Sequence, residues 1–284
     1  MNVPKSAAGL RILANQQRKN LIELCRRRGS LHLGGDMSSV EVIEVLFCNV
    51  LNIDPSNPSW EDRDRFILSK GHGSGMLYLA MAERGYFSMD EVMETYKGFQ
   101  TRFGMHPCRE VLPVLDASTG SLGHGLSLGV GMALAGRQDG KKHRVFVFLG
   151  DGELNEGSNW EAIMSAKHYK LGNLVAIVDH NKFSLDGPLA EVMDISPLSD
   201  KWRAFGWNVV SIEDGNNIDH VLEAFKMIPD AGSCVPTVFI ANTVKGKGVS
   251  FMENNYLWHG RTMTDQQVAD ALAELEEQSR SFEK

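Results

Sequence analysis

The chain has few cysteines, no long apolar run and no excess of basic residues. Its four cysteines are far apart and include no Cys-x-x-Cys pair, which argues against disulfides and zinc and for a reducing, cytoplasmic compartment. No apolar run is long enough to span a bilayer and no signal-peptide core is visible, so we expect no membrane association. A net charge of -7 without a basic stripe argues against nucleic-acid binding.

Three common site signatures are missing as well. The chain contains no GxxxxGK[ST], no GxGxxG and no HExxH, which excludes a P-loop, a dinucleotide-binding turn and a zinc-protease helix. The composition, with 43% hydrophobic and 23% charged residues in 284, is ordinary for a globular protein. No repeat or flexible linker is visible, so we expect a single domain over residues 1–284.

Apolar, β-prone runs alternate with helical patterns along the chain. Continuous apolar runs of this length are typical of strands buried on both faces, and their alternation with helices predicts a mostly parallel α/β sheet with helices on both faces. The predicted strands are 145–149, 174–178, 207–212 and 236–241, and a further short apolar run covers 65–68. The predicted helices include 10–28, 40–51, 76–83, 218–227 and the last twenty residues.

Two segments without regular periodicity stand between these elements. Residues 98–119 form a long irregular stretch, and loops of that length in a compact domain are usually functional. Residues 120–136 are rich in glycine, which predicts close backbone approach. Tight helix–sheet packing and direct ligand contact are equally good interpretations of those glycines.

Polar side chains follow two of the predicted strands. Asp151 comes directly after the first and Asn181 after the second, about one βαβ repeat apart. Because the carboxyl ends of parallel strands meet at one edge, these side chains are expected to converge. Mg²⁺ prefers oxygen ligands, and Asp151, Asn181 and a backbone carbonyl near Phe183 would leave room for diphosphate oxygens. The helix after Gly157 is expected to direct its N-terminus at the same place, favouring anions.

The residues around this pair carry a family resemblance. Gly-Asp-Gly-Glu-Leu-Asn-Glu-Gly at 150–157, with Asp-His-Asn-Lys-Phe-Ser-Leu-Asp-Gly at 179–187, resembles the thiamine-diphosphate signature in its transketolase form. The resemblance extends in order over essentially the whole chain and implies the thiamine-diphosphate-binding fold, in its diphosphate-binding module. The other matching segments are 32–35, 66–72, 105–107, 118–123, 245–248 and 258–260.

The resemblance implies a role for each matching residue. Asp151, Asn181 and the Phe183 carbonyl would hold Mg²⁺, for which Ca²⁺ or Mn²⁺ can substitute. Four histidines would line the reacting centre, where imidazole suits proton transfer near neutral pH. These are His32, His72, His106 and His259. The cofactor, thiamine diphosphate, would contact His72, Gly120, Ser121, Leu122, Asp151, Gly152, Glu153, Asn181 and His259.

Three further positions have interpretations of their own. Glu156 either caps its helix or belongs to a carboxylate relay between paired active sites, and the two roles are compatible. Lys70 stands where the full-length enzymes usually have asparagine, and Cys108 where glutamate is usual. Both departures are interpreted as lying near the substrate, which leaves the preferred ketose open.

Full-length transketolases carry a second domain that binds the pyrimidine ring of the cofactor, whereas this chain ends at Lys284. The resemblance therefore implies the diphosphate-binding subunit of a split transketolase, with a separately encoded pyrimidine-binding partner in an α2β2 assembly. Its reaction would be ketol transfer from a ketose phosphate to an aldose phosphate.

Several alternatives remain at this point. One is a transketolase-like enzyme for an unusual ketose. Others are a deoxyxylulose phosphate synthase-like or 2-oxoacid dehydrogenase-like subunit, against which the 105–107 and 155–157 segments argue. The last is a non-catalytic remnant or regulatory subunit, which the four histidines and both metal ligands disfavour.

Overall fold

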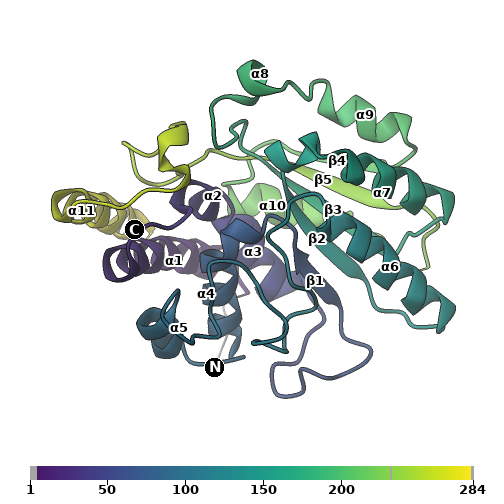
Figure 1. Ribbon diagram of the computed structural model, residues 1–284, viewed down its shortest axis with the longest axis horizontal. Helices are drawn as coiled ribbons and strands as arrows, with labels where there is room; N and C mark the ends of the chain where they lie inside the picture. The colour runs from purple at the N-terminus through teal and green to yellow at the C-terminus, as the bar shows by residue number, and fades with distance from the viewer. Residues whose placement is uncertain (1–4, 231, 283–284) are drawn as a thin grey trace.

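Five strands form one parallel sheet in this computed structural model, which describes residues 5–230 and 232–282. Their order across the sheet is β1-β2-β3-β5-β4 (Figure 1). The strands are β1 (Arg65–Leu68), β2 (Val145–Gly150), β3 (Leu174–His180), β4 (Asn208–Ile212) and β5 (Thr237–Asn242). The four predicted strands are confirmed to within two residues, and the short run at 65–68 is a fifth strand at the sheet edge.

Helices cover both faces of the sheet, as predicted. Alternate residues of β2 point to opposite sides: Phe146 and Phe148 join one buried cluster, and Val147 and Leu149 join the other. The first cluster is closed by α1 (Ala7–Arg28), α2 (Leu33–Ser38), α3 (Val40–Val45), α4 (Ser74–Arg84), α5 (Met89–Thr95), α10 (Ile218–Phe225) and α11 (Asp265–Phe282). The second is closed by α6 (Gly125–Gln138), α7 (Gly157–His168), α8 (Leu189–Val192) and α9 (Leu198–Ala204).

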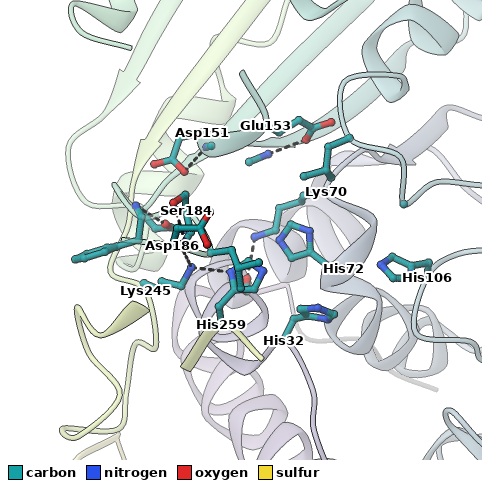
Figure 2. A pocket seen from close by; sticks show the side chains of 18 residues that line it. His32, Lys70, His72, His106, Asp151, Glu153, Ser184, Asp186, Lys245 and His259 are labelled. Carbon is teal, nitrogen blue, oxygen red and sulfur yellow. Dashed lines mark hydrogen bonds between the residues drawn. The ribbon is translucent and has the colours of Figure 1, made fainter. Parts of the chain in front are cut away.

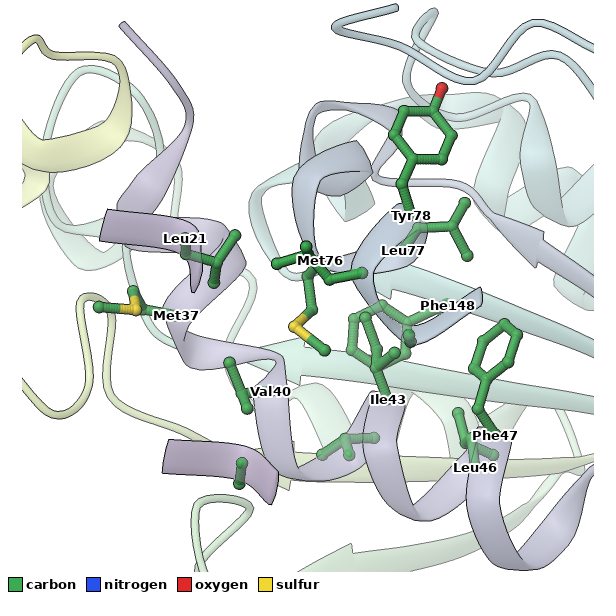
Figure 3. Packing of buried hydrophobic residues seen from close by; sticks show 14 of the residues in the cluster. Leu21, Met37, Val40, Ile43, Leu46, Phe47, Met76, Leu77, Tyr78 and Phe148 are labelled. Carbon is green, nitrogen blue, oxygen red and sulfur yellow. The ribbon is translucent and has the colours of Figure 1, made fainter. Parts of the chain in front are cut away.

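The first cluster holds the segment that carries much of the site. Figure 3 shows Phe148 of the sheet facing Met76 of α4 and Ile43 of α3. The predicted helix over 40–51 is only partly right, because the last turn, Leu46–Val50, is a π-helix in which the Leu51 amide donates to the Leu46 carbonyl at 2.9 Å. Residues 33–38 form a separate short helix, α2, that the sequence did not predict.

The glycine-rich segment packs tightly against the sheet, whereas direct ligand contact stays a prediction. Within α6, a Cβ on Gly129 would lie 2.5 Å from Cγ2 of Val147, and one on Gly136 would lie 2.6 Å from Nε2 of His143. These glycines therefore allow the helix to pack tightly. Gly120, which precedes the helix, instead lines the cavity at the carboxyl ends of the strands.

The cysteines and the helices bear on two further expectations from the sequence. All four cysteines are free thiols, as predicted, with Cys25 and Cys48 buried. Over residues 5–230 and 232–282, no helix is both long and apolar enough to cross a bilayer.

One carboxyl group lies inside the apolar layer of α1, α3 and α4. Glu44 is fully buried, its Oε2 is 3.6 Å from Sγ of Cys48, and its Oε1 has no partner among the described residues. Burial, reinforced by the nearby Glu83, raises the pKa of Glu44 from 4.5 to about 8. The folded protein therefore holds this group protonated at neutral pH.

We predict that Glu44 makes the fold less stable as the pH rises. The folded state binds the Glu44 proton more tightly than the unfolded chain. The contribution of this proton to the free energy of unfolding is complete below pH 4.5 and is lost as the pH rises through about 8. Between pH 5 and 9 the loss should be about 4 kcal/mol, and Glu44→Gln should remove it. Urea unfolding at several pH values measures the free energy of unfolding of wild type and of Glu44→Gln. The exposed Glu94→Gln variant is the control. Equal pH slopes in wild type and Glu44→Gln would contradict the prediction.

Candidate functional site

The carboxyl ends of four strands open onto one cavity of about 340 Å³. The segments after β1, β2, β3 and β5 all contribute to its wall, as expected for a ligand site in a parallel sheet. The lining residues are His32, Gly35, Lys70, His72, His106, Gly120, Leu122, Gly150, Asp151, Gly152, Glu153, Asn181, Phe183, Ser184, Leu185, Asp186, Lys245 and His259.

One side of the cavity presents oxygen atoms. The parallel register pairs Gly150 with Asp179, so that Asp151, one residue further on, and Asn181, two residues further on, reach the same sheet edge. The Asp151 carboxylate accepts hydrogen bonds from the amides of Gly152 (2.8 Å) and Lys182. The Asn181 Oδ1 accepts from the Phe183 amide at 3.1 Å. Asp151, Asn181 and Phe183 therefore meet around one space, as the sequence predicted.

The Asp151 carboxylate is buried without a counter-ion. It is 1% exposed and forms no ion pair with any residue in the described part of the chain. Burial and the neighbouring Asp179 raise the pKa of Asp151 to about 7. A cation beside this group would reverse that penalty, so the side chain suits a metal ligand.

The other side of the cavity presents imidazole rings. Ring centroids lie 5.4 Å apart for His32 and His72, 5.3 Å for His32 and His259, 5.1 Å for His72 and His259, and 6.0 Å for His32 and His106. In Figure 2 these rings lie across the pocket from Asp151. The four histidines come from four separate segments of the chain, and the fold brings them together as the sequence predicted.

A glycine fixes the position of His106. Gly120 has a φ of +139° and packs against this ring, where a Cβ would lie 3.1 Å from Cγ of His106. Both the backbone conformation and the lack of space require glycine here. The turn at 118–122 thus lines the cavity and supports one of its histidines.

Burial and the charge of Lys245 keep His32 and His259 neutral. Burial, followed by the charges of His106 and Lys245, lowers the pKa of His32 to about 4. Burial and Lys245 lower the pKa of His259 to about 3. Lys245 Nζ lies 3.0 Å from Nδ1 of His259, and an ammonium can only donate, so the ring proton of His259 sits on Nε2. The ring therefore offers a hydrogen-bond donor.

Three predicted site residues differ from the rest in their placement. Ser121 and Glu156 are exposed and lie outside the cavity lining. Glu156 occupies the N-cap position of α7 without a side-chain capping bond. Glu153 lines the cavity, but its carboxylate accepts from Ser69 Oγ and from the amides of Gly123 (2.9 Å) and Gly150 (3.1 Å). Its visible role is to hold the turns together. Cofactor contact by Ser121 and Glu153, and the relay role of Glu156, stay predictions.

The turn after β2 also differs from expectation. A 3-10 turn, Gly152–Asn155, intervenes between the strand and α7, and it supplies the cavity wall. Gly157, at the start of α7, does not line the cavity. The start of the 3-10 turn thus lines the cavity, and anion binding at the N-terminus of α7 stays a prediction.

Sequence reasoning missed the role of Lys245, and it named Lys70 without foreseeing its buried ion pair. Lys245 is buried beside His259 and also donates to the Ser184 carbonyl at 3.2 Å. The match of segment 245–248 to the family is the sequence signal that could have pointed to Lys245. Lys70 is likewise buried, and its ammonium donates to Asp179 at 2.6 Å. Lys70 lines the cavity while its ammonium group is engaged within the protein, and its predicted place near the substrate stays a prediction.

Known proteins resemble this chain along almost its full length. The family model for the transketolase thiamine diphosphate binding domain matches residues 11–283. An apulose-4-phosphate transketolase subunit of Phocaeicola vulgatus is 38% identical over 275 residues, which cover 97% of this chain and 96% of that protein. The 6-deoxy-6-sulfo-D-fructose transketolase subunit SqwG of Clostridium sp. strain MSTE9 is 42% identical over 265 residues, covering 93% and 95%.

The solved structures extend this likeness to the fold. Transketolase from Leishmania mexicana superposes with a TM-score of 0.88 at 28% identity over 96% of this chain. The chain spans only 41% of that solved protein.

We predict that Lys245→Met raises the pKa of His259. The substitution removes the charge 3.0 Å from Nδ1 while the ring stays buried, so the pKa should rise from about 3 but stay below 6.5. Histidine NMR titration reports the change directly. Lys247→Met is the matched control, because Lys247 pairs with Glu253 and does not line the cavity. An unchanged His259 pKa in Lys245→Met would show that its charge does not act on this ring.

Proposed function

The chain belongs to the transketolase N-terminal, thiamine-diphosphate-binding family, and from this membership we propose that it is the diphosphate-binding subunit of a two-subunit transketolase. The enzyme transfers a two-carbon ketol group from a ketose to an aldose. The observation that carries the proposal is the meeting of Asp151 and Asn181 with four histidines around one cavity.

The donor atoms on the Asp151 side fit a hard cation. A carboxylate, a carboxamide oxygen and the Phe183 carbonyl are ligands suited to Mg²⁺, Ca²⁺ or Mn²⁺. Within residues 5–230 and 232–282, no three His, Cys, Asp or Glu side chains form a metal cluster by themselves. The site would therefore need further oxygens, which a diphosphate supplies. We propose that Mg²⁺ and thiamine diphosphate bind together, with Asp151, Asn181 and Phe183 as the metal ligands.

The rest of the cavity suits the anionic cofactor and its reaction. Thiamine diphosphate supplies the carbanion that attacks the ketose carbonyl. Lys245 lines the cavity, where its ammonium group can balance the negative charge of a diphosphate. The neutral ring of His32 can accept or donate a proton at a substrate hydroxyl group, and the neutral ring of His259 can donate a hydrogen bond from Nε2 to a substrate oxygen. His32 and His259 thus have proton-transfer or positioning roles in the proposal.

A separately encoded partner is part of the proposal. Two similar proteins are named as transketolase subunits, and this chain matches them over 96% and 95% of their length. Exposed apolar side chains lie along the segments beside the cavity, with Leu185 59%, Met193 61% and Leu257 50% exposed. We propose that a pyrimidine-binding subunit covers them in an α2β2 assembly. The exposed carboxylate of Glu156 would then lie at the junction of two sites.

The substrates are proposed from the same relatives. One is named for apulose 4-phosphate and the other for 6-deoxy-6-sulfo-D-fructose, both of them ketoses that carry an anionic group. We propose a ketose of this kind as donor and an aldose as acceptor, which favours the unusual-ketose alternative over 2-oxoacid or deoxyxylulose chemistry. Cys108 remains a candidate for substrate choice, since it follows His106 at the cavity by two residues.

We also place the protein in the cytoplasm. Its four cysteines are all free thiols, with Cys234 exposed and Cys108 partly so. Exposed free thiols are typical of proteins in a reducing compartment.

We predict that the isolated chain has negligible transketolase activity and that its partner restores it. Co-expression with the neighbouring reading frame provides the partner, and ketol transfer is measured with saturating Mg²⁺ and thiamine diphosphate. In the reconstituted complex, Asp151→Ala should lower activity by about a hundredfold or more, because the metal loses its only carboxylate ligand.

The control is Asp139→Ala, an exposed carboxylate at the end of α6 that does not line the cavity. It should leave activity unchanged. Robust turnover by the purified chain alone would refute the partner, and full activity of Asp151→Ala would refute the metal assignment.

A further inference from the structure

Behind the cavity wall lies a carboxylate that the proposed chemistry does not use. Asp179 is fully buried and does not line the cavity. Its Oδ2 accepts hydrogen bonds from Ser38 Oγ (2.7 Å), Lys70 Nζ (2.6 Å) and Asn181 Nδ2 (2.9 Å). Its Oδ1 accepts from Thr243 Oγ1. Four donors from four segments thus converge on one side chain.

This arrangement determines which way the Asn181 carboxamide faces. The two ends of a carboxamide have nearly the same shape, so only hydrogen bonds distinguish them. A carboxylate can only accept, so Asp179 binds the NH₂ end of Asn181. The same nitrogen lies 3.5 Å from Ser38 Oγ. The carbonyl end is therefore turned the other way, toward the Phe183 amide and the cavity.

Lys70 keeps Asp179 in that accepting state. Its three ammonium protons go to the Gly35 carbonyl (2.8 Å), Ser39 Oγ (2.8 Å) and Asp179, so none is left for a ligand in the cavity. The Lys70 and Asp179 side chains are 1% and 0% exposed. A buried carboxylate is strongly disfavoured without such a partner. Lys70 thus belongs to the support of the site.

We propose that Lys70 and Asp179 are positioning residues that hold the carbonyl oxygen of Asn181 toward the cation, without touching metal or substrate. The inference rests on the metal site of the proposed function. Residues that orient metal ligands from behind commonly change metal affinity by about tenfold to a hundredfold when altered.

The test measures metal binding by the full chain, without catalysis. Mn²⁺ is titrated at saturating thiamine diphosphate, and free Mn²⁺ is followed by its EPR signal. Asp179→Asn should weaken Mn²⁺ binding by about tenfold to a hundredfold, because Asn181 can then turn its NH₂ toward the cation. The double variant Asp179→Asn/Asn181→Asp should restore the affinity, because either oxygen of an aspartate at 181 can face the metal.

Matched variants separate orientation from simple loss of structure. Thr243→Val removes the hydrogen bond to Oδ1, which Asn181 does not use, and should change Mn²⁺ affinity by less than about threefold. Ser38→Ala keeps the buried ion pair but removes a hydrogen-bond partner of both Asp179 and Asn181. It should weaken binding by about threefold to tenfold, and have no effect in an Asn181→Asp chain. Ser38→Ala decides the matter if Asp179→Asn does not fold.

The outcomes distinguish this inference from the proposed function. If wild type binds Mn²⁺ and Asp151→Ala does not, the metal site stands. Full affinity in Asp179→Asn, or in Ser38→Ala where the former is unfolded, would then overturn the positioning role. A double variant as weak as Asp179→Asn would also overturn it. Equal Mn²⁺ binding by wild type and Asp151→Ala would overturn the metal site and this inference with it.

Discussion

The parallel pairing of β2 with β3 is the constraint on which the site depends. Its register sets Gly150 opposite Asp179, and the Asp151 amide continues the ladder by donating to the Asp179 carbonyl at 3.2 Å. A shift by one residue would turn each side chain of a strand to the opposite face. The buried clusters on both faces fix this register, because the alternate residues of β2 fill them. Packing far from the cavity thus determines where the oxygen donors of Asp151 and Asn181 lie.

The cavity combines two opposite electrostatic demands in a small space. At one side, a buried carboxylate without a counter-ion attracts a cation. At the other, burial and Lys245 hold the imidazole of His259 neutral, with its Nε2 proton available for a hydrogen bond. An anionic cofactor bound with its cation would satisfy both sides, since the metal neutralises Asp151 while the diphosphate lies near the lysine. Without ligands, the protein keeps Asp151 apart from Lys245 and His259 and away from water, which lowers the stability of the fold. Binding of the cofactor and its cation would restore that stability.

Much of this site could be predicted from the sequence, because strand ends and glycine-flanked histidines leave local patterns. Asp151 and Asn181 follow apolar runs, and their meeting follows from the parallel sheet alone. The lysines leave no such pattern. Lys245 stands in a Lys-Gly-Lys-Gly run that is typical of exposed loops, and its burial depends on distant segments. In the same way, the orientation of the turn at 118–123 decides that Leu122 lines the cavity while Ser121 faces solvent.

The central claim is that Asp151, Asn181 and the Phe183 carbonyl hold a divalent cation. Anomalous diffraction from crystals of the assembled complex, grown with thiamine diphosphate and Mn²⁺, tests it most directly. We expect one Mn²⁺ peak at about 2–2.5 Å from an Asp151 carboxylate oxygen, Asn181 Oδ1 and the Phe183 carbonyl. A peak among the histidines, or no Mn²⁺ beside Asp151 in crystals that contain the cofactor, would contradict it.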